Sequence, residues 1–172
     1  MRLINKLKRS KPNYKEYLIS KGVSIGQNVD IIDSLIDETY SFLISIGDNV
    51  TITGASVLSH DASTFKFLGY TKIGKVEIGN NVFIGRGAIV LPNTTIGNNV
   101  VVGANSVVSG TIEDNSVVVG NPCKKICSLD EYLYKHRENM KHAYISDDDF
   151  NSMDDKEKLF LKDSLKGIGY AK

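Results

Sequence analysis

Residues 78–100 read IGNNVFIGRGAIVLPNTTIGNNV, and the spacing of the aliphatic residues in this stretch decides the fold. An aliphatic side chain returns at every sixth position, at Ile78, Ile84, Val90 and Ile96. A helix would repeat its buried face about every 3.6 residues, whereas a fixed six-residue period is typical of a parallel β-helix. The motif Ile-Gly-x-Asn-Val opens the stretch and recurs 18 residues later, at Ile96. Three hexapeptides therefore make one coil, which predicts a triangular cross-section.

The same motif extends the repeat toward the N-terminus, because it also begins at Ile25 and Ile46. An earlier six-residue series runs through Ile46, Ile52 and Leu58, so we expect the Leu58 side chain to point inward. Four residues after each inward position a small or β-branched residue follows, as at Val50, Ser56, Val82, Ala88, Thr94, Val100, Ser106 and Ile112. The interval from Ile46 to Ile78 is one coil plus 14 residues, which predicts an inserted loop over residues 61–74.

These patterns predict an all-β solenoid followed by a helical tail. The expected parts are an N-terminal segment (1–22), a parallel β-helix domain (23–127) and a C-terminal tail (128–172). In the tail, Leu129, Leu133, His136 and Met140 recur at helical spacing. Terminal repeats of such a stack are expected to be atypical, because they must cap it.

Composition excludes several classes of protein. The 172 residues include 21 Lys and Arg and 20 Asp and Glu, so net charge gives no reason to expect nucleic acid as a partner. No apolar run approaches the roughly 20 residues of a membrane span. Cys123 and Cys127 can form neither a disulfide framework nor, without a second pair, a zinc site. We therefore expect a reduced, cytoplasmic protein that requires no metal.

His60 is the histidine of the repeat segment, since His136 and His142 lie in the tail. It follows Leu58 by two residues, which predicts a corner position facing outward, next to the insertion. An imidazole titrates near neutrality and suits a general base, so we expect His60 to be catalytic.

The acid that would orient this histidine is left open by the sequence. Asp61 is adjacent to His60, but neighbours in an extended segment point to opposite faces. Asp33, Asp37 and Glu38, one coil earlier, are equally eligible. We expect Asp33, Asp37 and Asp61 to orient the histidine or to bind the substrate.

Two further segments carry a resemblance to a known family. Residues 58–63 read LSHDAS and residues 119–126 read VGNPCKKI. With the repeats, they resemble the hexapeptide-repeat acyltransferases, in particular the galactoside and maltose acetyltransferases and the acetyltransferases of polysaccharide biosynthesis. The resemblance implies a left-handed β-helix. It also implies a homotrimer that binds acetyl-CoA in a groove between neighbouring subunits, with His60 as the catalytic base.

The resemblance further implies a set of acetyl-CoA contacts, namely Arg86, Ala104, Ser109, Gly110 and Lys124. Arg86 stands where relatives carry a small residue, and Ser109-Gly110 replaces a Thr-Lys pair. The lost cation could be supplied by Arg86, Lys124 or Lys125. Gly110 is expected on the same corner column as His60.

The insertion contains Phe65, Phe67 and Tyr70, which are many aromatic residues for a surface loop. We expect them to pack against a neighbouring subunit and to wall the acceptor site. Core packing within the same chain is the alternative.

The predicted function is acetyl-CoA-dependent O-acetylation of a sugar hydroxyl, in surface-polysaccharide biosynthesis. N-acetylation of a nucleotide-linked amino sugar and acetylation of a streptogramin-type antibiotic remain alternatives. A carbonic anhydrase would need three zinc-binding histidines, and the repeats offer one. An ice-binding solenoid would need regular threonine rows, and Thr51 and Thr53 make a single row.

Overall fold

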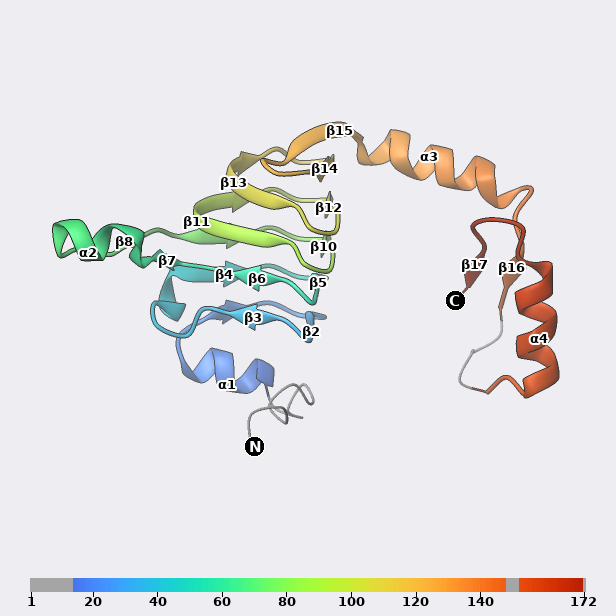
Figure 1. The fold of residues 1–172 in the computed structure, drawn as a ribbon, viewed down its shortest axis with the longest axis horizontal. Coiled ribbons are helices and arrows are strands. Elements are labelled where there is room, and N and C mark those ends of the chain that lie inside the picture. The colour runs from blue at the N-terminus through green and yellow to red at the C-terminus, as the bar shows by residue number, and fades with distance from the viewer. Residues whose placement is uncertain (1–13, 148–151, 172) are drawn as a thin grey trace. The chain divides into compact units, whose positions relative to one another are not determined.

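The computed structural model describes residues 14–147 and 152–171. It divides into two compact units, Met1–Leu129 and Asp130–Lys172. The first unit is a stack of short parallel strands, and each unit is described below by itself (Figure 1).

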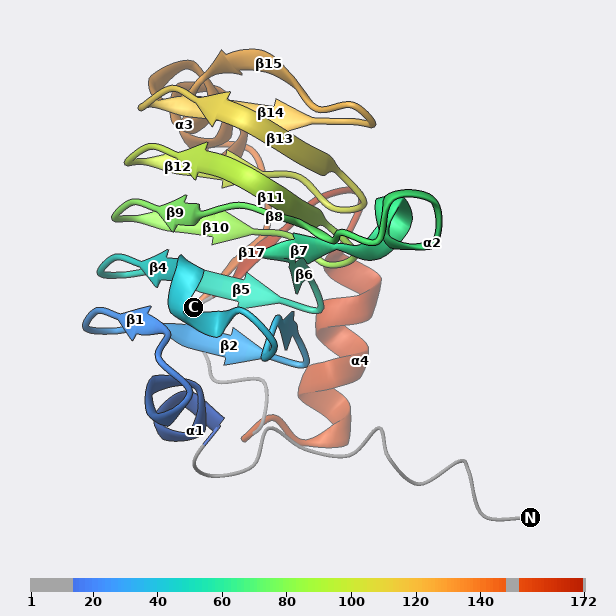
Figure 2. The same ribbon diagram turned by 90° about the vertical axis from the view of Figure 1, so that its left-hand side faces the viewer.

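The strands of the first unit stack in three columns, which Figure 2 shows from the side. The first column contains β1 (Ser24–Ile25), β4 (Ile44–Ile46), β9 (Val76–Ile78) and the C-terminal parts of β11 (Ile89–Ile96) and β13 (Val107–Ile112). The second contains β2 (Asp30–Ile32), β5 (Thr51–Thr53), β10 (Val82–Ile84), β12 (Val100–Val102) and β14 (Ser116–Val119). The third contains β3 (Leu35–Ile36), β6 (Ser56–Val57) and the N-terminal parts of β11 and β13. Every pairing within a column is parallel, so each coil of the chain contributes one strand to each column.

The inward side chains of the three columns form one continuous apolar core. Ile78, Ile84 and Val90 are at most 4% exposed, as are their partners one coil above, Ile96, Val102 and Val108. Burial of this kind contributes about 1.5–3 kcal/mol for each aliphatic side chain. The six-residue period of the sequence is therefore confirmed as the period of the core.

Asparagines turn the corner between the first and second columns. Asn28, Asn49, Asn81 and Asn99 have φ between 51° and 56°, a left-handed conformation that asparagine tolerates better than most residues. Their side-chain amides form a ladder, each Nδ2 donating to the Oδ1 of the next asparagine at 3.0–3.2 Å. We call this set the asparagine ladder.

The expected inward position of Leu58 is wrong by one residue. Val57 is fully buried and pairs with Val90, whereas Leu58 is half-buried. The interval from Ile52 to Val57 is five residues because Gly54, at φ +55°, turns this corner with one residue fewer than the coil above. The same shift puts Ala55, 3% exposed, in the place expected for Ser56.

The expected place of Ile112 is also wrong. Ile112 pairs with Ile96 in the first column, although it follows Val108 by only four residues. Leu91, Pro92 and Asn93 fill the corner of β11, and the register shifts there, so β13 crosses the same corner with a shorter chain. The last full coil is therefore two residues short.

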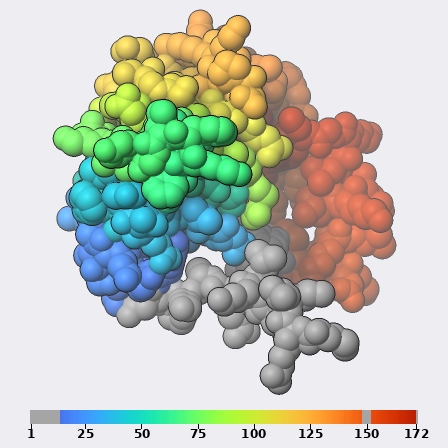
Figure 3. Space-filling model, turned by 60° about the vertical axis from the view of Figure 1, so that its left-hand side comes forward, coloured from blue at the N-terminus to red at the C-terminus, as the bar shows by residue number. Residues whose placement is uncertain are grey.

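The insertion leaves the stack between the third and first columns. Its base is an antiparallel pair, β7 (His60–Asp61) with β8 (Lys72–Ile73), and its tip holds the 3-10 turn Ala62–Thr64 and the short helix α2 (Phe65–Leu68). Gly69 ends α2 at φ +73°. The insertion reaches outward from the side of the stack in Figure 1, and it lies on the face turned toward the viewer in Figure 3 (green).

Helix α1 (Tyr14–Ser20) and strand β15 (Lys124–Ser128) flank the coils. Leu18 of α1 is fully buried in the core, and Tyr14 packs against the same core. β15 runs antiparallel to β14, unlike any pairing within the columns. Both terminal elements depart from the repeat, as expected of caps.

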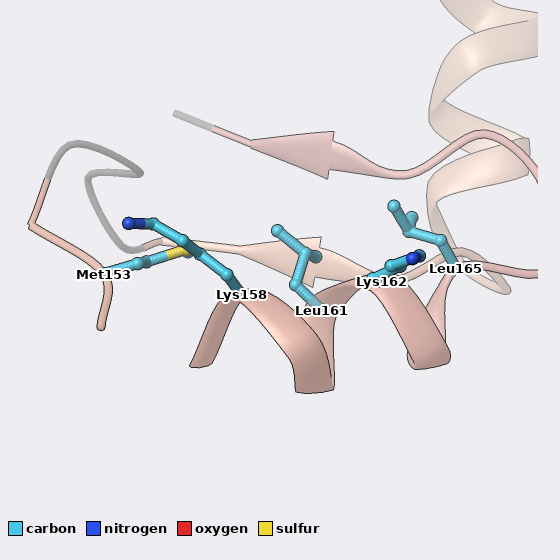
Figure 4. A pocket seen from close by; sticks show the side chains of 5 residues that line it. All are labelled: Met153, Lys158, Leu161, Lys162 and Leu165. Carbon is cyan, nitrogen blue, oxygen red and sulfur yellow. The ribbon is translucent and has the colours of Figure 1, made fainter. Parts of the chain in front are cut away.

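The tail contains the helix predicted from the spacing of Leu129, Leu133, His136 and Met140, which is α3 (Leu129–Met140). It also contains a second helix, α4 (Asp155–Ser164), and the strands β16 (Ile145–Ser146) and β17 (Tyr170–Ala171), which pair in parallel. A capping box formed by Asp154 and Glu157 begins α4. A groove of about 410 Å³ lies beside α4, lined by Met153, Lys158, Leu161, Lys162 and Leu165 (Figure 4). Among the described residues, no helix combines the length and apolarity needed to cross a membrane.

Candidate active site

The imidazole of His60 lies against the carboxylate of Asp37, one coil below. His60 Nδ1 contacts Asp37 Oδ2 directly. Asp37 is 4% exposed, whereas the side chain of His60 is 31% exposed. Because an ionised carboxylate only accepts hydrogen bonds, Nδ1 carries the proton, and the lone pair of the neutral ring is left on Nε2. When the ring is neutral, the pair therefore leaves Nε2 of this partly exposed side chain as a proton acceptor.

Asp37 is held in place by hydrogen bonds to both of its oxygens. The backbone N–H and the hydroxyl of Ser59 donate to Oδ2 at 3.0 and 2.9 Å, and the N–H of Thr39 donates to Oδ1 at 3.0 Å. Burial raises the pKa of the Asp37 carboxyl, but the hydrogen bonds from His60, Thr39 and Ser59 outweigh it and lower the pKa overall. Asp37 is therefore an ionised group beside the imidazole.

The other eligible acids bind elsewhere. The Asp61 carboxylate contacts Lys72 Nζ at 2.5 Å and accepts the N–H of Ser63 at 2.8 Å; these hydrogen bonds, that from Lys72 above all, lower its pKa to about 2. Asp33 lies 3.8 Å from the guanidinium of Arg86. Glu38 accepts a hydrogen bond from the hydroxyl of Tyr17 at 2.6 Å. Of the acids that the sequence left open, the structure brings Asp37 to His60.

The residues assigned to acetyl-CoA lie at two corners. Arg86 and Ala104 occupy equivalent positions after the second column, because Ile84 pairs with Val102. Both are exposed, and the Arg86 side chain lies over Gly54, where an added Cβ would come within 2.8 Å of the guanidinium. Ser109 and Gly110 follow the third column and are also exposed. The outer face of the third column therefore connects the two groups.

The expected alignment of Gly110 with His60 is corrected by the pairing. Gly110 pairs with Thr94, which pairs with Val76, two residues after the insertion. His60 stands at the start of the insertion, three residues after Val57. The two residues share a corner of the stack but stand on opposite sides of the inserted chain. Lys124 and Lys125 are exposed on β15 and pair with Val119 and Val118.

The aromatic residues of the insertion do not join the core of their own chain. Phe65, Phe67 and Tyr70 are 58%, 83% and 78% exposed, and Ile73 at the base is 55% exposed. Core packing within the chain, the alternative for these side chains, is therefore wrong.

Sequence reasoning missed Tyr40, whose ring lies beside the imidazole. The centroids of the Tyr40 and His60 rings are 5.6 Å apart, with their planes tilted by 57°. Ser59 Oγ also lies 3.1 Å from the carbonyl oxygen of Tyr40. The available signal was the interval from Ile25 to Ile46, which exceeds one coil by three residues.

Comparisons with known proteins agree with this fold. Residues 75–110 match the family described as bacterial transferase hexapeptide (six repeats). The chain is 40% identical over 145 residues to Protein CapG of Staphylococcus aureus, an alignment that covers 80% of this chain and 84% of CapG. The chain therefore belongs to the hexapeptide-repeat acyltransferases.

Solved structures point to the same family. A maltose O-acetyltransferase from Clostridium difficile 630 superposes with a TM-score of 0.55 at 28% identity, covering 72% of this chain and 79% of the other. A galactoside acetyltransferase in complex with coenzyme A gives a TM-score of 0.55 at 26% identity, covering 76% and 77%. The chain is an acyltransferase by this membership.

Proposed function

We propose that this protein transfers an acetyl group from acetyl-CoA to a hydroxyl of a sugar, in the assembly of a surface polysaccharide. The observation that carries the proposal is the pairing of His60 with the buried Asp37 at the corner where the insertion leaves the stack. The maltose and galactoside acetyltransferases among the similar structures support a sugar acceptor. The coenzyme A complex supports acetyl-CoA as the donor.

In the proposed reaction, His60 Nε2 takes the proton from the acceptor hydroxyl while the oxygen attacks the thioester carbonyl. The Asp37 carboxylate stabilises the imidazolium that forms and keeps Nε2 aimed outward. The tetrahedral intermediate then expels the thiolate of coenzyme A. The imidazolium returns its proton to the thiolate, so the enzyme ends in its starting state and no metal takes part.

We propose that acetyl-CoA lies along the outer face of the third column. Its contacts would be Arg86 and Ala104 at one corner, Ser109 and Gly110 at the other, and Lys124 and Lys125 above. Arg86 is the cation that would meet the phosphates, and its neighbour Asp33 would position it. The acceptor would bind at the His60 end, near Asp37 and Asp61.

Ala104→Leu is expected to weaken acetyl-CoA binding, because the larger side chain points outward into the proposed path of the cofactor and spares the core. Calorimetric titration of acetyl-CoA should show a lower affinity than for the unmodified protein, while the acceptor KM changes less. Arg86→Ala should weaken binding too, and more strongly at low salt, where charges are less screened. Ala171→Leu, an exposed change in the tail, is the matched control. Equal affinities for Ala104→Leu and the unmodified protein would place the cofactor elsewhere.

We also propose that three copies assemble around a threefold axis, with each active site shared between neighbours. The outward residues of the first column are polar: Ser24, Ser45, Glu77, Thr95 and Thr111. The other two columns expose apolar side chains, including Ile32 (47%), Phe83 (43%), Leu35 (55%) and Ile89 (36%). With the aromatic insertion, this apolar surface is the kind that a second copy covers.

Sedimentation is expected to report a species near three times 18.9 kDa. Replacing Phe67 and Tyr70 together by serine should shift the protein toward smaller species, because these side chains are the most exposed aromatics of the insertion. Activity should fall with assembly. A monomer with full activity would contradict a shared active site.

We propose that the coils wind left-handed with a triangular cross-section and that residues 23–127 are the catalytic domain. The three strand columns support the triangle, and the family resemblance supports the hand. We also propose a cytoplasmic location, which the composition and the two free cysteines, Cys123 and Cys127, support.

The direct test of function is thiol release from acetyl-CoA, measured with a colorimetric thiol reagent. The acceptor panel would contain simple sugars, nucleotide-linked amino sugars and virginiamycin. Release with a sugar, together with an O-acetyl product in the mass spectrum, is the expected result. Release with an amino sugar or the antibiotic alone would replace the proposed acceptor by one of these alternatives.

A further inference from the structure

We propose that Tyr40 and Phe42 form an aromatic shelf beside His60 that binds the C–H face of the acceptor's sugar ring. This inference rests on the proposed function and adds the surface that would select the acceptor. The shelf belongs to a small insertion, residues 37–43, between β3 and β4.

Two insertions leave the stack at the same corner, in successive coils. The first joins β3 to β4, and the second, which begins with His60, joins β6 to β9. Since β3 pairs with β6 and β4 pairs with β9, the two inserted segments lie one above the other. The coils above cross this corner inside the continuous strands β11 and β13. Extra chain is thus concentrated around the catalytic histidine.

The backbone of the first insertion is fixed by hydrogen bonds. Asp37 Oδ1 accepts the N–H of Thr39 at 3.0 Å, and the carbonyl of Tyr40 accepts the N–H of Leu43 at 3.0 Å. Ser41 is 3% exposed, and its hydroxyl donates to the carbonyl of Lys21. The shelf therefore stands on a rigid base that also holds the Asp37 carboxylate.

On this rigid base, the insertion presents aromatic rings toward solvent. Phe42 is 67% exposed, and Tyr40 is half-buried between Phe42 and His60. The Tyr40 and Phe42 centroids are 6.4 Å apart with planes at 63°, an edge-to-face contact. At Gly22, whose φ is +99°, an added Cβ would come within 3.2 Å of the Phe42 Cβ, so the chain packs closely under the exposed ring.

The position of the reacting nitrogen makes this shelf part of the acceptor's path. His60 Nδ1 is hydrogen-bonded to the Asp37 carboxylate. An acceptor hydroxyl that gives its proton to His60 must therefore come within hydrogen-bond distance of Nε2. Tyr40 flanks the same imidazole. A molecule that places a hydroxyl on Nε2 would therefore lie beside the Tyr40 ring.

The chemistry of a pyranose suits this arrangement. Its hydroxyls project from the rim of the ring, while its faces carry C–H groups that can pack on the electron-rich face of an aromatic ring. Apolar and aromatic walls with a few convergent polar groups are typical of small-molecule sites. The shelf would then hold the ring while His60 receives one rim hydroxyl.

Saturation-transfer NMR tests the shelf without requiring turnover. The probes are the methyl pyranosides of glucose, galactose, mannose and N-acetylglucosamine, each with the protein and coenzyme A, which has no acetyl group to transfer. In the unmodified protein, saturation is expected on the ring C–H protons of one face of at least one probe. Tyr40→Leu should abolish that transfer, and Tyr40→Phe should restore it, because the ring is what makes the contact. Phe42→Ser removes the exposed ring of the shelf. It should weaken the saturation transfer without affecting folding, because the Phe42 side chain is largely exposed.

Kinetics with the best acceptor give a second reading. Tyr40→Leu should raise the acceptor KM roughly tenfold, the upper range for one aromatic contact, with acetyl-CoA affinity unchanged. Tyr134→Leu, a 65% exposed tyrosine on α3, is the matched control. Sedimentation of Tyr40→Leu should equal that of the unmodified protein.

The outcomes separate this inference from the proposed function. Saturation that depends on Tyr40, without thiol release, would retain the shelf and overturn the acetyl transfer. Suppose instead that a sugar causes thiol release, but that its saturation and its KM are the same in Tyr40→Leu and in the unmodified protein. That result would retain the function and overturn the shelf. Absence of saturation for every probe, or a Tyr40→Leu protein that fails to assemble but still binds sugar, would also overturn the shelf.

Discussion

His60→Ala is expected to lower kcat by about 10²–10⁴-fold, the usual effect of removing a general base. Acetyl-CoA affinity should be unchanged, because the base acts on the acceptor hydroxyl in the transition state. The variant should also lose about 1 kcal/mol of stability, since the buried Asp37 carboxylate loses one hydrogen-bond donor and keeps those from Ser59 and Thr39. Initial rates, calorimetric titration and thermal unfolding measure the three effects.

His142→Ala is the matched control for this variant, because His142 is an exposed histidine of the tail. Its rate and melting temperature should equal those of the unmodified protein. An active His60→Ala protein would remove the mechanism altogether.

Asp37→Asn is expected to lower kcat by up to about 10⁴-fold, because the carboxamide no longer fixes the tautomer of the imidazole. The carboxamide has the size of the carboxylate but lacks its charge, so the imidazolium formed during the reaction is less stabilised. The NH2 group of the new side chain must also face a backbone N–H that now donates to Asp37, that of Thr39 or that of Ser59, and two donors cannot form a hydrogen bond with each other. The acceptor KM should change little, which separates loss of positioning from loss of binding.

The pH dependence of unfolding gives Asp37→Asn a second readout. The pKa of Asp37 is lowered in the folded protein, so its carboxylate stabilises the fold above the ordinary aspartate pKa, near 3.9. That contribution disappears as the pH falls through the folded-state value. The stability difference between the unmodified protein and Asp37→Asn should therefore be full at pH 7 and shrink below about pH 4. Asp30→Asn, at an exposed position, should show no such difference; a constant difference down to pH 2 would contradict the lowered pKa.

The six-residue period alone predicted the core, because each hexapeptide contributes one buried aliphatic residue. This rule holds wherever the corners of successive coils have the same length. It failed at Leu58 and Ile112, where corners are one and two residues shorter. Corner length depends on local backbone choices such as the left-handed Gly54, and a side-chain pattern does not report these. The spacing between repeats revealed the insertion. It did not reveal the turn and the short helix within the insertion.

The site was predictable in part. His60 stood out because histidine is rare in the repeats, whereas the carboxylate beside it was one of four eligible acids. Choosing Asp37 required knowing how two coils stack at a corner with inserted chain, which is a three-dimensional fact. Tyr40 was missed for the same reason, since it is 20 residues from His60 and unremarkable in the sequence.

The asparagine ladder has a consequence for how the protein can diversify. Successive rungs are separated by 21, 32 and 18 residues, yet their amides meet at nearly the same distance. The ladder thus keeps the spacing of successive coils constant at one corner. This spacing does not depend on how many residues are inserted at another corner. Doubling a flexible loop adds only about 0.6 kcal/mol of closure entropy. The loops at the histidine corner can therefore change in length without disturbing the register of the coils at the asparagine ladder.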